Sequence, residues 1–189
     1  MKNLNKNKKI IIICHCLINN NSKVYNFGIV KEDFEQRKKD LINLFINNNI
    51  GIIQLPCPEL TCYGCNRWGH VKEQFDTPHF RKTCKTLLEN YVDQIEDYIK
   101  NDFSILGVIG INGSPSCGVD KTCSGKWYGE LSSNENLSNM LSSLTVVNEA
   151  GVFIEELISI FETKNIKIPI LGLDSMNIDK IFKLFESKI

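Results

Sequence analysis

Four short apolar runs, separated by longer segments of helical character, constrain the fold of this chain more than any other feature of its sequence. The runs are short and rich in β-branched residues, which is typical of strands covered on both faces of a parallel sheet. The four runs are residues 10–13, 50–56, 104–111 and 166–173. The segments that we predict to be helices are residues 30–47, 78–99, 148–163 and 177–187.

Periodicity and end signals support the two longest predicted helices. In residues 30–47, apolar side chains recur at spacings of three, four and seven among charged ones, which indicates an amphipathic helix. Thr77 and Pro78 form a helix start, because the hydroxyl can accept a hydrogen bond from a free amide and proline suits the first helical position.

Strands that alternate with helices predict βαβ connections and a sheet with helices on both faces. We therefore expect an α/β fold, Rossmann-like or flavodoxin-like, with an open, mostly parallel sheet of four or more strands. The 189 residues suit a single α/β domain over residues 1–189. Residues 112–147 are long for a connection in such a fold, and we expect a lid or an excursion there.

Charge and hydropathy exclude several classes of partner. The chain has 22 basic and 22 acidic side chains, and no basic stripe follows its first nine residues, so we expect no nucleic acid polymer as a partner. The apolar run at residues 10–13 is too short for a signal peptide or a membrane span. We therefore predict a cytoplasmic protein without a membrane partner, and the sequence predicts no particular oligomeric state.

Eight cysteines indicate thiol chemistry. In a reducing compartment they are better explained as metal ligands or as redox and catalytic groups than as four disulfides. Cys84 is the exception, because it lies on the apolar stripe of a predicted helix and packs like a small hydrophobic residue. The other seven are Cys14, Cys16, Cys57, Cys62, Cys65, Cys117 and Cys123.

Three of the predicted strands are followed by cysteines in the next loop. Cys14 and Cys16 follow the first run, Cys57 follows the second, and Cys117 follows the third. Ligands of open parallel sheets bind at the carboxyl ends of the strands, so we expect these thiols to meet there. Neighbouring thiolates are stabilised by a soft metal centre, either zinc or an iron–sulfur cluster. The alternative is that each packs as an ordinary half-buried residue.

The CYGC segment, with Cys62 and Cys65, allows two other interpretations. Four thiolates from Cys57, Cys62, Cys65 and either Cys117 or Cys123 would complete a structural zinc shell, which predicts a zinc-stabilised binding module without enzymatic activity. A CxxC pair also occurs in thiol redox and sulfur-carrier proteins.

The motifs CHCL, CPE and SPSCG, in this order, resemble those of the thiouracil desulfidase family, and the similarity covers about residues 10–130. The segment VYNFG, residues 24–28, is also similar to that family. The resemblance implies that Cys16, Cys57 and Cys117 hold a four-iron four-sulfur cluster with one open iron. It implies an iron–sulfur-dependent, non-redox desulfidase that removes sulfur, as hydrosulfide, from a small thiolated compound such as a thio-nucleobase.

The resemblance directs attention to polar and aromatic residues near these motifs. Glu59 and Ser114 are candidates for proton transfer, although Glu59 can also cap a helix and Ser114 can hold a turn. Aromatic side chains can stack on a flat heterocycle, although core packing or lid contacts explain them equally well. The aromatic candidates are Tyr25, Tyr63, Trp68 and Trp127.

The chain also differs from the family pattern. The segment after CPE reads LTCYGCNRWGH where the family is rich in glycine, and GING precedes SPSCG where the family often has a basic residue. We therefore expect a divergent, cysteine-richer member. The extra thiols that provide alternative metal ligands are Cys14, Cys62, Cys65 and Cys123.

Overall fold

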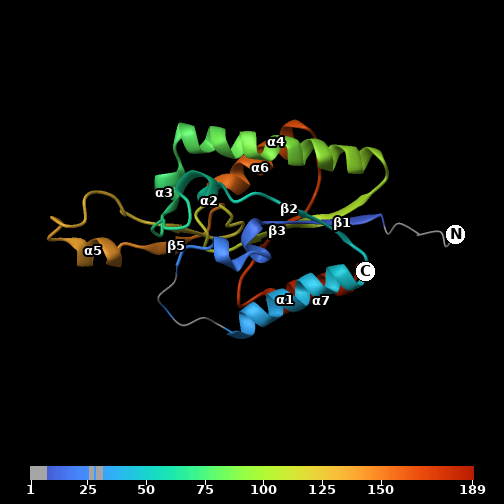
Figure 1. The fold of residues 1–189 in the computed structure, drawn as a ribbon, viewed down its shortest axis with the longest axis horizontal. Coiled ribbons are helices and arrows are strands. Elements are labelled where there is room, and N and C mark those ends of the chain that lie inside the picture. Colours follow the sequence, from blue (N-terminus) through green and yellow to red (C-terminus); the bar gives the residue numbers. More distant parts are fainter. Residues whose placement is uncertain (1–7, 26–27, 29–31) are drawn as a thin grey trace.

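A four-stranded, wholly parallel sheet forms the centre of the protein (Figure 1). The computed structural model describes residues 8–25, 28 and 32–189. The strand order is β2-β1-β3-β6, as in the first strands of flavodoxin-like sheets. The strands are β1 (Lys9–Ile13), β2 (Gly51–Gln54), β3 (Ser104–Ile111) and β6 (Ile170–Leu173).

Helices cover both faces of this sheet, which confirms the predicted fold class (Figure 1). Two helices pack together on one face and two on the other. One pair is α4 (Pro78–Lys100) and α6 (Val152–Thr163), and the other is α1 (Glu32–Asn47) and α7 (Ile178–Glu186). Residues 30 and 31 of the first predicted helix lie outside the described residues.

The apolar run of β1 is buried because each face of the strand meets a different helix pair. Ile10 and Ile12 pack with Leu88 and Phe153 of α4 and α6, whereas Ile11 and Ile13 belong to the cluster formed by α1 and α7. Side chains alternate between faces along a strand, so a strand covered twice needs apolar residues at every position.

The order of the strands reverses at β1, which lies between β2 and β3. In open parallel sheets this reversal opens a crevice between the carboxyl ends of the two central strands. Residues 14–17 leave β1 at this edge, and residues 112–118 leave β3 beside them. The fold thus brings two of the cysteine motifs to the position where such sheets bind ligands.

Several short helices at this edge were not predicted from the sequence. Cys57 caps one of them, because its Sγ accepts a hydrogen bond from the amide of Leu60 at 3.4 Å and Pro58 follows at the first helical position. Gly64 ends that helix with φ of +72°, a conformation that favours glycine. The short helices are η1 (His15–Leu17), η2 (Asn20–Ser22), α2 (Pro58–Tyr63) and α3 (Lys72–Phe75).

The long predicted connection has two parts. Residues 112–118 fold back onto the sheet edge, and the remainder forms an arm that projects from the body (Figure 1). The arm contains β4 (Thr122–Ser124), α5 (Leu137–Ser142) and β5 (Thr145–Val147), with β4 and β5 antiparallel. The helix predicted from residue 148 begins only at Val152, because Gly151 occupies its N-cap.

No helix in the part of the chain that the structure describes is both long and apolar enough to cross a membrane.

Candidate functional site at the carboxyl edge of the sheet

Cys16, Cys57 and Cys117 come from three different loops and act on one another electrostatically. Burial raises the pKa of the Cys16 thiol, and the neighbouring thiols of Cys117 and Cys57 raise it further. Burial also raises the pKa of Cys57 to about 11, with a contribution from Cys117. The three thiols named by the sequence motifs therefore lie near one another.

The loop that carries Cys117 is fixed between β3 and the start of α6. The Cys117 carbonyl accepts a hydrogen bond from the amide of Ile111 at 2.9 Å, so the loop turns back onto its own strand. The first amides of α6 donate to the same loop, from Val152 to the Pro115 carbonyl at 3.1 Å and from Phe153 to the Ser116 carbonyl at 3.0 Å. These contacts satisfy free helix amides and hold the loop rigidly.

Cys14 approaches Cys117 from the core. Its side chain is fully buried. The pKa of Cys117 lies well above its ordinary value, mainly because of a hydrogen bond with Cys14. Both residues belong to the apolar cluster under α4 and α6. Cys14, predicted as an alternative ligand, therefore contacts a predicted ligand.

Glu59 connects the CPE and SPSCG motifs. Its Oε1 accepts a hydrogen bond from Ser116 Oγ at 2.5 Å and a longer one from Ser114 Oγ at 3.4 Å. Ser114 Oγ also accepts hydrogen bonds from the amides of Ser116 at 3.3 Å and Cys117 at 3.0 Å. Glu59 and Ser114, the two predicted catalytic residues, thus lie beside the thiols. Ser114 also holds the turn of the loop, as the alternative interpretation of this residue predicted.

Sequence reasoning missed two residues of this site, Ser116 and Arg67. Ser116 is 1% exposed, and its hydroxyl lies 3.5 Å from Cys117 Sγ. Its place beside Cys117 in the SPSCG motif could have identified it from the sequence. Arg67 forms an ion pair with Glu59, with 3.3 Å between Nε and Oε2. No local pattern distinguishes Arg67 from a solvent-exposed arginine.

The remaining cysteines have different surroundings. Cys62 lies in the last turn of α2, where burial raises its pKa, and Cys65 is exposed. A helix C-terminus is the negative end of the dipole and disfavours a thiolate, unlike the helix N-termini that activate many reactive thiols. Cys123 lies in β4 near Glu73, and Cys84 is buried in the core as predicted.

Of the predicted aromatic residues, Tyr63 and Trp127 make defined contacts near the site. The Tyr63 ring packs against His70 and Phe75, with centroid distances of 4.9 and 5.6 Å, and the charge of Glu59 acts on it. Trp127 Nε1 donates to the Gly69 carbonyl at 3.1 Å. Tyr25 and Trp68 are 75% and 71% exposed.

A buried ring nitrogen lies beside this aromatic stack. His70 Nδ1 has no hydrogen-bond partner within the described ranges of the chain. Burial lowers the pKa of His70, which favours the neutral imidazole. A bound molecule with a suitable donor or acceptor would remove the cost of this unpaired atom.

The thiols are not arranged around a single point. Within residues 8–25, 28 and 32–189, no three His, Cys, Asp or Glu side chains are grouped closely enough to share one metal ion. Such an ion requires sulfurs about 4 Å apart, since each zinc–sulfur bond is about 2.3 Å long.

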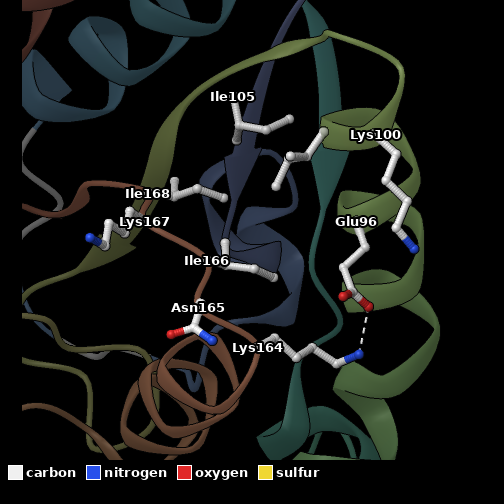
Figure 2. Close-up of a pocket in the computed structure, with 9 residues that line it drawn as sticks. Glu96, Lys100, Ile105, Lys164, Asn165, Ile166, Lys167 and Ile168 are labelled. Atoms are coloured by element: carbon white, nitrogen blue, oxygen red, sulfur yellow. Dashed lines mark hydrogen bonds and ion pairs between the residues drawn. The ribbon is translucent and has the colours of Figure 1, made fainter.

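A pocket of about 290 Å³ lies at the opposite, amino edge of the sheet (Figure 2). Four isoleucines line it, and Lys164 Nζ contacts Glu96 Oε2 at 2.5 Å. Lys100 and Lys164 stand where α4 and α6 end, and positive charge there complements the helix dipoles. None of the predicted site residues lines this pocket, and we assign it no ligand.

The fold and the site define an α/β protein with a thiol-rich, carboxylate-containing site at the switch point of a parallel sheet. The chain is 38% identical over 116 residues to an uncharacterized protein, MJ0003, of Methanocaldococcus jannaschii. The match covers 61% of this chain and 71% of that protein, and the chain belongs to the same family as MJ0003. No family model and no solved structure matches the chain.

Proposed function

We propose that the protein is a cytoplasmic desulfidase that removes sulfur, as hydrosulfide, from a small thiolated heterocycle such as a thio-nucleobase. One observation carries the proposal: three thiols from three separate loops act electrostatically on one another, and beside them lies a carboxylate that is hydrogen-bonded to two serines. The sequence resemblance to thiouracil desulfidases points to the same residues, namely Cys16, Cys57, Cys117, Glu59 and Ser114.

The donor set suits an iron–sulfur cluster. Thiolates are the usual protein ligands of such clusters, and three cysteines leave one iron of a four-iron four-sulfur cluster without a protein ligand. In a cluster each cysteine binds a different iron, so the sulfurs are spaced more widely than around a single ion. Cys16, Cys57 and Cys117 act electrostatically on one another at one edge of the sheet without grouping around a single point, which suits separate binding to three irons.

Desulfidation is a hydrolysis and requires no net electron transfer. Water adds to the thiocarbonyl carbon, the carbon–sulfur bond breaks, and a carbonyl and hydrogen sulfide are the products. A bound cluster with an open iron supplies a Lewis acid for the sulfur. The protein must provide the proton transfers and hold the heterocycle.

Glu59 and the two serines provide a path for protons in this proposal. Glu59 takes a proton from the attacking water and returns one to the departing sulfur. Ser116 Oγ, which lies between Glu59 Oε1 and Cys117 Sγ at 2.5 and 3.5 Å, keeps the carboxylate oriented towards the thiols. Positioned proton transfer of this kind contributes about 10²- to 10⁴-fold in rate.

Tyr63 and His70 provide the supporting contacts for a heterocycle. The Tyr63 ring belongs to an aromatic cluster and is partly exposed, so its free surface can pack against a flat substrate. The unpaired Nδ1 of His70 favours a ligand that carries a hydrogen-bonding ring atom.

Metal analysis tests the proposal first. Anaerobically reconstituted protein should contain about four irons and four sulfides per chain and absorb broadly in the visible range. Cys16→Ala, Cys57→Ala and Cys117→Ala should lose the iron, whereas Cys123→Ala, the control in β4, should retain it. Reconstituted protein should then release sulfide from a thiouracil in a reaction that Glu59→Gln slows.

Two results would contradict the proposal. About one zinc per chain without iron uptake would favour the zinc-stabilised binding module. Iron that is retained in Cys117→Ala but lost in Cys62→Ala or Cys65→Ala would show that the CYGC segment, and not the three motif cysteines, binds the metal.

A further inference from the structure

Arg67 is a buried cation that contacts the candidate site directly. Its side chain is 3% exposed. The guanidinium donates to three acceptors: Nη2 to the Ser22 carbonyl at 2.7 Å, Nη1 to the Gly64 carbonyl at 3.0 Å, and Nε to Glu59 Oε2 at 3.3 Å. A buried guanidinium is stable only when its donors are paired in this way.

The acceptors of Arg67 lie on two of the cysteine loops. Ser22 ends η2, the turn that follows Cys16, and Glu59 is two residues after Cys57. The third loop, which carries Cys117, is linked to Arg67 through the Glu59 carboxylate, because Glu59 Oε1 accepts a hydrogen bond from Ser116. The planar guanidinium thus connects the loops of Ser22 and Glu59, and Arg67 itself is 45 residues from Ser22 in sequence.

Arg67 and Ser116 bind opposite oxygens of one carboxylate. Arg67 holds Oε2 and Ser116 holds Oε1, so the Glu59 side chain is fixed from both sides. Arg67 is an ion-pair partner of Glu59 and donates its other two hydrogen bonds to backbone carbonyls. Its action on the site therefore passes through Glu59 and the backbone of the Cys16 loop.

We propose that Arg67 is a positioning residue that holds Glu59 and the loops of Cys16 and Cys57 in their working arrangement. An effect of Arg67 on turnover rests on the proposed desulfidase function, whereas its effect on the arrangement of the two loops does not. Loss of such supporting contacts typically lowers activity or metal affinity by roughly 10- to 100-fold.

The chain offers a matched control in Arg81. Its guanidinium also has three acceptors, Asp76 at 2.6 Å, Glu155 at 2.6 Å and Glu156 at 2.7 Å, but these belong to the segment before α4 and to α6. Arg67→Met and Arg81→Met thus each remove a guanidinium with three acceptors, although those of Arg81 are all carboxylates, and only Arg67 contacts the site.

The first readout is the alkylation rate of individual cysteines in the full-length, metal-free chain, followed by mass spectrometry. Arg67→Met should speed the labelling of Cys16 several-fold, because its loop loses the connection to Glu59. Cys57 is left out of the comparison, because the charge of Arg67 also stabilises its thiolate. Arg81→Met should not change the labelling rate of Cys16. Equal labelling in the wild type and Arg67→Met, or an equal rise in Arg81→Met, would overturn the proposal.

The second readout is steady-state turnover of a thiouracil by reconstituted protein. Arg67→Met should lower kcat by roughly 10- to 100-fold with KM little changed, and combining it with Glu59→Gln should cost no more than Glu59→Gln alone. Additive losses would contradict an action through Glu59. If Arg67→Met does not fold, Arg67→Lys serves, because an ammonium cannot bridge Ser22 and Glu59 as the planar fork does.

The two proposals fail in different ways. A wild-type chain that binds no iron and turns over no thiolated substrate would contradict the desulfidase function, and the labelling comparison would still decide the role of Arg67. Normal turnover together with unchanged labelling in Arg67→Met would remove the role of Arg67 and leave the desulfidase function in place.

Discussion

Ser116 Oγ lies 2.5 Å from Glu59 Oε1, whereas Ser114 Oγ lies 3.4 Å from the same oxygen. The second serine of SPSCG therefore makes the closer contact with the carboxylate. The first serine is engaged mainly by the amides of residues 116 and 117. The hydroxyls of the two serines lie 3.2 Å apart but have different main partners, Glu59 for Ser116 and the loop backbone for Ser114.

We expect Ser116→Ala and Ser114→Ala to have different effects. Ser116→Ala removes the closer hydrogen bond to Glu59 and should lower kcat for desulfidation by at least about tenfold, with a small change in stability. Ser114→Ala leaves two amides without an acceptor and should also lower the free energy of unfolding by about 1–3 kcal/mol. Turnover and urea unfolding of both variants test this, and wild-type kcat in Ser116→Ala would contradict it.

Glycine at position 110 is required by the return of the Cys117 loop. A Cβ on Gly110 would lie 2.4 Å from the Cys117 carbonyl oxygen, a distance that forces the loop to move. Gly110→Ala should therefore lower the free energy of unfolding by about 1–3 kcal/mol and reduce iron binding. Gly69→Ala is the control, because its Cβ would meet no atom within 4 Å. Equal stability and iron content in the two variants would contradict this role of the loop.

Patterns that are local in sequence predicted the body of the fold. The run at residues 10–13 is apolar at every position because both faces of β1 are covered, and the predicted strand at 104–111 agrees with β3 in full. Helices with an apolar stripe and a start signal, such as α4 after Thr77, were equally recognisable. In each case the residues that determine the structure lie close together in the chain.

Contacts between distant segments were not predictable in the same way. The motif cysteines could be placed at one edge because parallel strands end there, but the link from Arg67 to Ser22 spans 45 residues and leaves no periodic signal. The short helices α2 and α3 were missed because each is too short to show an apolar stripe. Their formation depends on caps and on packing against the body.

The arm between β4 and β5 should be dispensable for folding. None of the residues of α5 is buried, and the hydrogen bonds of residues 128–142 stay within the arm. Replacing these residues with a short Gly-Ser turn should shift Tm by no more than a few degrees, because little apolar surface is lost. Thermal unfolding by circular dichroism measures this, and a protein that no longer unfolds cooperatively would show that the arm belongs to the domain core.

The base of the arm should behave differently from its tip. Trp127 Nε1 donates to the Gly69 carbonyl at 3.1 Å, and the Gly125 amide donates to Glu73 Oε2 at 3.3 Å. Trp127→Ala should therefore release the arm from the segment before α3 and increase proteolytic cleavage near residue 126. Cleavage at the wild-type rate would contradict this anchoring.

Acid should weaken the contact between α3 and α4. The Arg81 guanidinium, 2.6 Å from Asp76, holds the pKa of Asp76 below its ordinary value. As pH falls below about 4, the unfolded chain binds a proton on Asp76 before the folded one does, so the free energy of unfolding decreases. This contribution is fully present above about pH 5 and is lost as pH falls through the folded pKa. Because Asp76 is half exposed, it amounts to less than about 1 kcal/mol.

Asp76→Asn tests this directly. The variant should be less stable than the wild type at pH 7, and the difference should shrink as pH falls from about 5 towards 2, because protonation removes the same charge from the wild type. Glu89→Gln, on the exposed face of α4, is the control and should follow the wild-type curve. Urea unfolding at a series of pH values gives the comparison. A difference between Asp76→Asn and the wild type that stays constant down to pH 2 would mean that Asp76 acts through something other than its charge, such as a cap on the turn before α4.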